Sequence, residues 1–507
     1  MYQDFIERKE NFMKKSTKIL TLLLAVLLVI PTVFLFSSCD GNKGNGPEGT
    51  TPGTGTTDAT LPTLEVKNLG GIDIKVLWPE IHADGHYLHN EIAIEGTPSN
   101  SIEQAVFERN FAVENAYNVS IISQTEFIST IPKTVRTQAM GNVSEWSAVV
   151  STINFMTPIA QEGWLTDFNT LTHYSENAQP WWNHSLMQDF SIANARYFAS
   201  GDIIYSDDFY PYCTYVNTAV SDAYQIEEDY YSLVKNKEWT LEKFHELSAL
   251  VATDYSYGSD AYADTVMHGA VINANFFKAA YYSAGEGMLA FNKDGYPVWK
   301  MEKDRTQTIL EKAISIVHDD NACVFSDLID GNHAANELTL FSSNKSLFLV
   351  EELIISERLA NHETKVDFKV LPFPLYEAGG EYISVLNDAA LIAIPSMVTN
   401  SNDVCLVLSA MSRESVNTLT PAFFENVLTY RYMQDPGSVE TLQIILNSTV
   451  APDVATIQDW GGFLSEFKRL GQEGTATFAG VYDSNIGVAM GLLEEYCVLL
   501  DKYYANK

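Results

Sequence analysis

Residues 72–78 read IDIKVLW, and this run of β-branched and apolar residues predicts the first strand of the fold. Asn100 or Ser101 can cap a helix whose apolar residues recur at helical spacing over 102–116. A second strand is expected at 119–122, where the sequence is VSII. The chain therefore begins with a strand, a helix and a strand.

A further helical segment is expected near 134–140, and residues 148–151, AVVS, predict a third strand. This β-α-β-α-β order is typical of a parallel sheet with right-handed crossovers. Ligands of such sheets collect at the carboxyl ends of the strands. That rule draws attention to Trp78 and to residues 151–154.

The later sequence continues the alternation of helices and strands. Helices are expected after the cap Thr240, after Thr420 and Pro421 as far as about Met433, and over 488–504. Strands are expected at 346–350, 368–372 and 390–395. Residues 63–507 are too many for a single ordinary core, so two lobes are expected.

The N-terminus has the pattern of an export signal. A basic head at 13–18 precedes an apolar run over 19–30, which Pro31 ends. The run is shorter than the roughly 20 residues that a membrane-spanning helix needs. Residues 35–39, LFSSC, resemble the lipobox of bacterial lipoproteins, which predicts cleavage before Cys39 and lipidation of Cys39. The alternative is an uncleaved signal anchor with an incidental cysteine.

The flanks of this signal favour the same interpretation. Acidic residues within 1–12 are unusual before a basic head, so Met13 is the expected start of the natural chain. Residues 40–62 consist almost entirely of Gly, Thr, Pro and polar residues and predict a flexible tether. We therefore expect residues 1–38 to be a signal peptide and 39–62 to be a lipidated cysteine with its tether.

Composition excludes some classes of function. The 507 residues carry 31 basic and 65 acidic side chains, a net charge of −34, and the basic residues form no long run, which argues against nucleic-acid binding. The remaining cysteines are far apart and lack a C-x-x-C spacing, which favours buried free thiols over a disulfide framework or a metal site. They are Cys213, Cys323, Cys405 and Cys497.

The order of these features resembles the extracellular solute-binding lipoproteins of bacterial ABC importers, in the group of maltodextrin-binding protein. The resembling segments, besides Cys39 and the strand that ends at Trp78, are 107–110 (FERN), 163–168 (GWLTDF), 179–183 (QPWWN), 215–217 (YVN), 238–244 (EWTLEKF), 370–374 (VLPFP) and 421–425 (PAFFE). The resemblance extends over nearly all of residues 70–435.

This resemblance implies an α/β protein with the two-lobed periplasmic-binding-protein-like fold of type II. Each lobe has a mainly parallel sheet flanked by helices, and a ligand cleft lies at the hinge. The implied lobes are 63–205 with 346–388, and 206–345 with 389–507. Crossings between them are expected near 203–214, 345–352 and 384–392.

Short catalytic motifs are missing, which weakens the case for an enzyme: there is no G-x-S-x-G, H-E-x-x-H, Walker A loop or G-x-G-x-x-G after a strand. No cofactor is expected. His82, His86 and His89 lie near Glu91 and have donor types that suit zinc. Gly85 and its neighbours favour a solvated loop instead, so no metal site is predicted and metal binding by these histidines stays open.

The candidate ligand-binding residues suit a sugar, because aromatic rings stack on its C–H faces and carboxylates or amides bind its hydroxyls. Aromatic residues expected near the cleft include Trp78, Trp181, Trp182, Tyr205, Tyr210 and Tyr212. Most of them can equally be core or hinge packing. The predicted site comprises Trp78, Asn154, Asp207, Asp208, Tyr210, Glu351, Glu352, Asn387 and Asp388.

Three functions remain open at this point. The resemblance favours a monomeric, membrane-anchored binding protein that captures a carbohydrate and presents it to the permease subunits of an ABC transporter. The alternatives are a secreted glycan hydrolase, to which paired carboxylates could contribute, and a surface adhesion or sensor protein.

Overall fold

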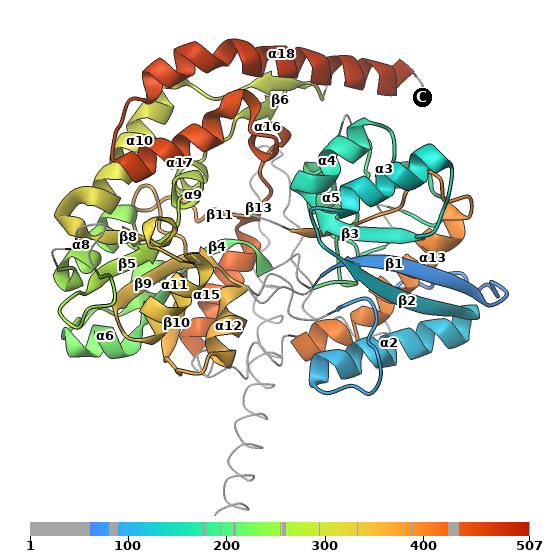
Figure 1. The fold of residues 1–507 in the computed structure, drawn as a ribbon, viewed down its shortest axis with the longest axis horizontal. Helices are drawn as coiled ribbons and strands as arrows, with labels where there is room; N and C mark the ends of the chain where they lie inside the picture. Colours follow the sequence, from blue (N-terminus) through green and yellow to red (C-terminus); the bar gives the residue numbers. More distant parts are fainter. Residues whose placement is uncertain are drawn as a thin grey trace, which may run out of the picture. The chain divides into compact units, whose positions relative to one another are not determined.

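A computed structural model describes the folded part of the chain (Figure 1). The described residues are 61–80, 90–175, 179–192, 194–205, 209–253, 255, 260–293, 295–331, 333–386, 389–423 and 436–505. The predicted signal, Cys39 and the tether up to residue 60 lie outside them, as do His82, His86, His89, Asp207, Asp208, Asn387 and Asp388. Among the described residues, none of the helices combines the length and apolar character that spanning a bilayer requires.

The N-terminal strands form the predicted parallel sheet. In the described part of the chain this sheet has the order β12-β3-β1-β2, in which β1 pairs in parallel with β2 and β3, and β12 is antiparallel to β3. Its strands are β1 (Ile72–Pro79), β2 (Val119–Glu126), β3 (Ala148–Thr152) and β12 (Ala390–Ala393). The three N-terminal strands predicted from hydrophobic pattern are confirmed.

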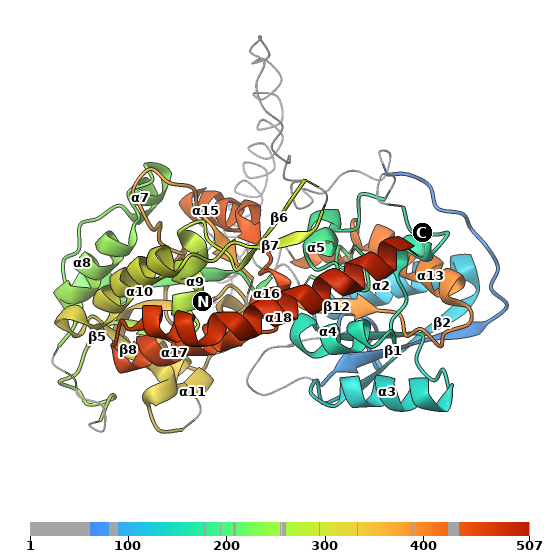
Figure 2. The same ribbon diagram turned by 90° about the horizontal axis from the view of Figure 1, so that it is seen from above.

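Helices cover both faces of this sheet. The chain moves from β1 to β2 on one side and then returns to β3 on the other, so right-handed crossovers place the two connecting helices on opposite faces. Figures 1 and 2 show α2 on one face and α3 on the other. The helices of this lobe are α2 (Ser101–Tyr117), α3 (Ile131–Gly141), α4 (Ile153–Gln161), α5 (His184–Asp189) and α13 (Ser401–Ser415).

The second lobe is built on another mixed sheet, whose order among the described residues is β10-β4-β9-β5-β8. Strands β9, β5 and β8 are parallel to one another, whereas β4 is antiparallel to both of its neighbours. The strands are β4 (Tyr212–Asn217), β5 (His268–Ile272), β8 (Cys323–Phe325), β9 (Ser346–Glu352) and β10 (Phe368–Pro372).

The second lobe also contains most of the helices. They are α6 (Thr218–Ala223), α7 (Tyr230–Lys235), α8 (Leu241–Val251), α9 (Phe276–Ser283), α10 (Lys303–His318), α11 (His333–Ser342), α12 (Ile355–Asn361), α15 (Pro436–Asn447), α16 (Val454–Ile457), α17 (Phe463–Glu473) and α18 (Phe478–Ala505). Two short ribbons complete the fold: β6 (Leu289–Phe291) with β7 (Pro297–Trp299), and β11 (Ser384–Val385) with β13 (Thr449–Val450).

Local capping signals in the sequence are accurate. The Asn100 side chain accepts a hydrogen bond from the backbone N–H of Glu103 and caps α2, and Thr240 caps α8 in the same way through Lys243. The C-terminal helix was expected at 488–504 but begins ten residues earlier, at Phe478. The helix expected after Thr420 is present over 419–423, and its continuation lies outside the described residues.

The division of the chain between the lobes differs from the expected one. Residues 346–388 were assigned to the first lobe, but β9 and β10 pair with β4 and β5 of the second sheet. Residues 389–507 were assigned to the second lobe, but β12 and α13 belong to the first, since β12 pairs with β3 and α13 packs on α2. Strand pairing between distant segments decides these assignments, and no local pattern reports it.

Two of the three expected crossings are observed. The chain leaves the first sheet after Ala199, which pairs with Ile392 of β12, and enters the second at β4. It returns between β10 and β12, where Pro211 bridges Leu386. No crossing occurs at 345–352, because the strands before and after this segment share one sheet. The chain crosses again between α13 and α15.

Candidate functional site

The order of strands in the second sheet creates a switch point between β5 and β9. The connection from β5 leads to β8 on one side, and the connection from β8 returns to β9 on the other side of β5. In open α/β sheets, ligands bind in the crevice at the carboxyl ends of the two strands that flank such a point. Those ends are Asn273, directly after β5, and Glu351 with Glu352 at the end of β9.

Hydrogen bonds join these residues into one cluster. Asn273 donates from Nδ2 to Glu351 Oε1 at 2.8 Å, and the same nitrogen lies 3.5 Å from Glu337 Oε1 of α11. Ser326 Oγ donates to Glu337 Oε1 at 2.6 Å. The Tyr212 hydroxyl donates to Asn273 Oδ1 at 3.2 Å. We call Tyr212, Asn273, Glu337, Glu351 and Glu352 the carboxyl-edge cluster.

Burial controls the electrostatics of this cluster. Glu337 is 1% exposed, Glu352 3% and Glu351 9%. Burial, followed by the nearby Glu337 and Glu352, holds the pKa of Glu351 well above its ordinary value. Burial also raises the pKa of the Tyr212 hydroxyl, so this group stays a neutral donor. The edge therefore carries fewer negative charges at neutral pH than its three carboxyl groups suggest.

The first sheet has its own switch point, between β1 and β3. Trp78, near the end of β1, is 0% exposed and lies in the core of this lobe. Asn154, in the first turn of α4 directly after β3, is exposed. The structure thus presents Asn154 at this edge, whereas it places the Trp78 ring inside the lobe.

Phe155 is a residue that sequence reasoning missed. It follows Asn154 in the first turn of α4 and is 38% exposed, less than the rings of Phe111 and Phe291 elsewhere in the chain. Thr152, the N-cap position of α4, makes no capping bond, so the first N–H groups of the helix have no side-chain partner there. The sequence feature that could have indicated Phe155 is its position three residues after the strand 148–152, at the same edge of the sheet as Asn154.

The remaining aromatic candidates are buried in the described structure. Tyr210 is 1% exposed, and Trp181 and Trp182 lie in the core of the first lobe. Tyr205 is 6% exposed and stacks on Phe423, with ring centroids 4.2 Å apart. These rings pack the hinge and the first lobe in the structure as it stands.

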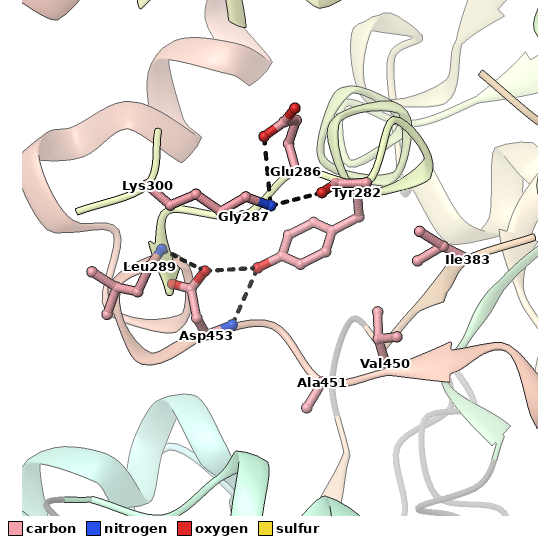
Figure 3. A pocket seen from close by; sticks show the side chains of 10 residues that line it. Tyr282, Glu286, Gly287, Leu289, Lys300, Ile383, Val450, Ala451 and Asp453 are labelled. Carbon is pink, nitrogen blue, oxygen red and sulfur yellow. Dashed lines mark hydrogen bonds and ion pairs between the residues drawn. The ribbon is translucent and has the colours of Figure 1, made fainter. Parts of the chain in front are cut away.

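A pocket of about 270 Å³ lies beside the crossing strands (Figure 3). We call it the hinge pocket; its lining consists of Tyr282, Gly285, Glu286, Gly287, Leu289, Lys300, Ile383, Val450, Ala451 and Asp453. Helix α9 separates the hinge pocket from the carboxyl-edge cluster. The helix begins at Phe276, close to Asn273 of the cluster, and Tyr282 of the pocket lies six residues further along it. An α-helix rises 1.5 Å per residue, so Phe276 and Tyr282 are about 9 Å apart along the axis of α9.

Asp453 organises the hinge pocket. Its Oδ2 accepts from the backbone N–H of Met288 at 2.8 Å and of Leu289 at 3.2 Å, and its Oδ1 caps α16 through Thr456. The Tyr282 hydroxyl points toward this carboxylate, and Lys300 points toward Glu286 (Figure 3). Because Asp453 follows β13, this network fastens a hinge strand to the β6–β7 ribbon.

The carboxyl groups at this edge can be compared with the catalytic pair of a glycosidase. Two carboxyl groups of a retaining glycosidase lie about 5–5.5 Å apart, with an inverting pair further apart still. Glu337 and Glu351 are both buried, and their Oε1 atoms lie 3.5 Å and 2.8 Å from the same nitrogen, Nδ2 of Asn273. Within the described residues, no group of three or more His, Cys, Asp or Glu side chains is arranged to hold a metal ion.

Comparisons with known proteins extend this description. No protein-family model matches the sequence, and no curated protein matches it. Among solved structures, the ABC substrate-binding protein Lmo0181 from Listeria monocytogenes, in complex with cycloalternan, is 14% identical with a TM-score of 0.57, covering 83% of this chain and 99% of that chain. The cyclic alpha-maltosyl-1,6-maltose binding protein from Arthrobacter globiformis is 11% identical with a TM-score of 0.56, covering 84% and 100%.

UspC of M. tuberculosis is also similar, at 14% identity and a TM-score of 0.53, with 82% of this chain and 99% of that chain covered. At these identities the likeness shows the fold. The chain therefore has the two-lobed α/β fold of ABC substrate-binding proteins, as the sequence predicted.

Proposed function

We propose that this chain is the solute-binding component of an ABC importer, which captures a carbohydrate and delivers it to the permease. The observation that carries this proposal is the pair of polar edges at the switch points of the two sheets. These edges carry amide and carboxyl groups, which suit the hydroxyls of a sugar. The fold is shared with proteins that bind cycloalternan and cyclic maltosyl-maltose. Closure of the lobes around the ligand would retain it, because a ligand that touches both lobes binds the closed state better.

Residues from both lobes contribute in this proposal. The second lobe supplies Asn273, Glu351 and Glu352, and the first supplies Asn154 together with the exposed ring of Phe155. The sugar's C–H face would stack on that ring, while the polar groups bind its hydroxyls. The predicted ligand contacts of Asp207, Asp208, Asn387 and Asp388 stay predictions, whereas the side chains of Trp78 and Tyr210 are buried in the structure.

We infer that the protein works as a monomer and binds without turnover. The absence of short catalytic motifs supports binding over glycan hydrolysis. Lipidation of Cys39 would hold the mature chain at the outer face of the membrane, and the tether would let the two lobes reach the permease. The adhesion or sensor alternative lacks a specific observation in its favour.

A ligand screen tests the proposal. The mature chain is incubated with cycloalternan, maltotriose, D-mannitol and a wider glycan panel, and the melting temperature is recorded. A ligand at 100 times its Kd should stabilise the folded state by about 2.7 kcal/mol. Asn154→Ala with Phe155→Ala should abolish the shift, whereas the control Phe291→Ala, an exposed ring on the β6–β7 ribbon, should keep it. Sustained release of reducing ends would favour the hydrolase instead.

A further inference from the structure

One side of α4 stays exposed from the ligand edge of the first lobe to the end of the helix. Asn154, Phe155 and Pro158 are exposed, and Gln161, the last residue of the helix, is half-buried. An α-helix has 3.6 residues per turn, so Gln161, seven residues after Asn154, points in nearly the same direction and lies about 10 Å further along the axis. These four side chains form one stripe, which we call the α4 face.

Pro158 changes the hydrogen bonding of the α4 face. In a regular helix the backbone N–H of residue 158 donates to the carbonyl of residue 154, but proline has no N–H. The Asn154 carbonyl therefore lacks its ordinary helical donor, and the exposed side-chain amide of Asn154 lies beside it. The α4 face thus offers both donors and acceptors to a hydroxyl, while the rings of Phe155 and Pro158 can pack against C–H groups.

The far end of the α4 face contacts the second lobe. Gln458, directly after α16, donates from Nε2 to Gln161 Oε1 at 3.1 Å. The oxygen of Gln458 in turn accepts from Trp460 Nε1 at 2.8 Å. Since Asn154 and Gln161 lie on one line along α4, this contact means that the α4 face is turned toward the second lobe.

A pocket of about 430 Å³ opens at this contact. Gln161 and Gln458 line it with amides, and helix α18 adds the apolar side chain of Val498 and the charged side chains of Glu495 and Lys502. We call it the α18 pocket. Its volume is typical of ligand sites, which occur preferentially between domains. Its amides, charges and apolar surface suit a molecule that carries both hydroxyl and C–H groups.

We propose that a glycan lies along the α4 face, with one sugar at Asn154 and Phe155 and a distal sugar in the α18 pocket. The first of these contacts rests on the proposed function, in which the α18 pocket has no role. The pocket begins about 10 Å from Asn154 along the helix, so one sugar ring does not reach both places and a chain of several sugars does. The α18 pocket therefore makes the site selective for longer glycans.

Titration calorimetry of the mature chain tests the distal site. The probes are maltose, maltotriose and maltohexaose, together with cello-oligosaccharides of the same lengths. In the series that binds, the hexasaccharide should bind about tenfold or more tightly than the disaccharide. Val498→Trp, which fills the α18 pocket, should remove this gain and leave the affinity for the disaccharide unchanged. Val488→Trp is the matched control, because Val488 is 62% exposed on the same helix and does not line the pocket.

Pro158→Ala tests the α4 face separately. The new N–H can donate to the Asn154 carbonyl, so the melting temperature of the ligand-free chain should rise. The affinity for every glycan that binds should fall about fivefold, the equivalent of one neutral hydrogen bond. A purely structural role of Pro158 would raise the melting temperature without this loss of affinity. Pro132→Ala is the control, since Pro132 lies in the first turn of α3, where its missing N–H interrupts no helical bond.

The outcomes separate this proposal from the proposed function. Equal affinity for short and long glycans in the wild type, or an undiminished gain in Val498→Trp, would overturn the distal site while sugar binding stands. Undiminished affinity in Pro158→Ala would overturn the path along the α4 face. Failure of every glycan in both series to bind the wild type would count against the proposed function and would remove this proposal with it.

Discussion

Replacement of Trp78 by alanine should destabilise the first lobe rather than remove a ligand contact. The sequence suggested a stacking residue at the end of the first strand, but the ring is 0% exposed and packs in the core that includes Ile74, Val76 and Val150. A buried aromatic side chain covers about 150–250 Å², which at about 25 cal/mol per Å² corresponds to about 4–6 kcal/mol. Measured Trp→Ala changes in cores cost about 3–5 kcal/mol.

The assay is urea or thermal unfolding of the ligand-free mature chain. Trp78→Ala should lower the free energy of unfolding by about 3–5 kcal/mol, and Trp78→Phe should lower it by less, because the smaller ring fills part of the space. Phe111→Ala is the control, since this side chain is 61% exposed on α2 and should change stability by less than about 0.5 kcal/mol. An unchanged melting temperature in Trp78→Ala, together with weakened sugar binding, would refute the core assignment.

Three further predictions concern other parts of the chain. Burial raises the pKa of Asp202 to about 6, so the folded state loses stability as the pH rises from about 4 to 6. Asp202→Asn should flatten this pH dependence and raise the free energy of unfolding by about 3 kcal/mol above pH 6, as measured by urea unfolding. An unchanged pH profile in this variant would contradict the prediction. Asp453→Ala should lower the free energy of unfolding by about 2–4 kcal/mol, because the N–H groups of Met288 and Leu289 and the N-terminus of α16 lose their acceptor. Asp453→Asn should recover part of this stability. Equal stability of the alanine variant and the wild type would argue against the network. Cys39→Ala should leave an unprocessed precursor or release the protein from membranes, and mass spectrometry that finds no lipid on Cys39 of the wild type would rule out the anchor.

The local elements of the fold were predictable because their causes lie within a few residues. The run over 72–78 and the caps Asn100 and Thr240 depend on short-range patterns and hydrogen bonds. The pairing of β9 with β4 was not predictable, since it joins segments more than 130 residues apart. Long-range pairing also places β10, which pairs with β4, and β12, which pairs with β3.

The candidate site was predictable to a similar extent. The rule of carboxyl ends located Glu351, Glu352 and Asn154, and it would also have found Asn273, which follows the apolar strand 268–272. Glu337 was not predictable, because a helix brings it to the edge from a separate part of the chain. The burial of Trp78 was not predictable, because a strand covered on both faces gives no period-2 signal of which residues are exposed.

Small-angle X-ray scattering can show whether the two lobes close around a captured sugar. The mature chain is measured alone and at saturation with a glycan that raises its melting temperature. Closure should give a smaller radius of gyration with the glycan, and the Asn154→Ala, Phe155→Ala double variant should show no such decrease at the same concentration. An unchanged radius at proven saturation of the wild type would contradict capture by closure.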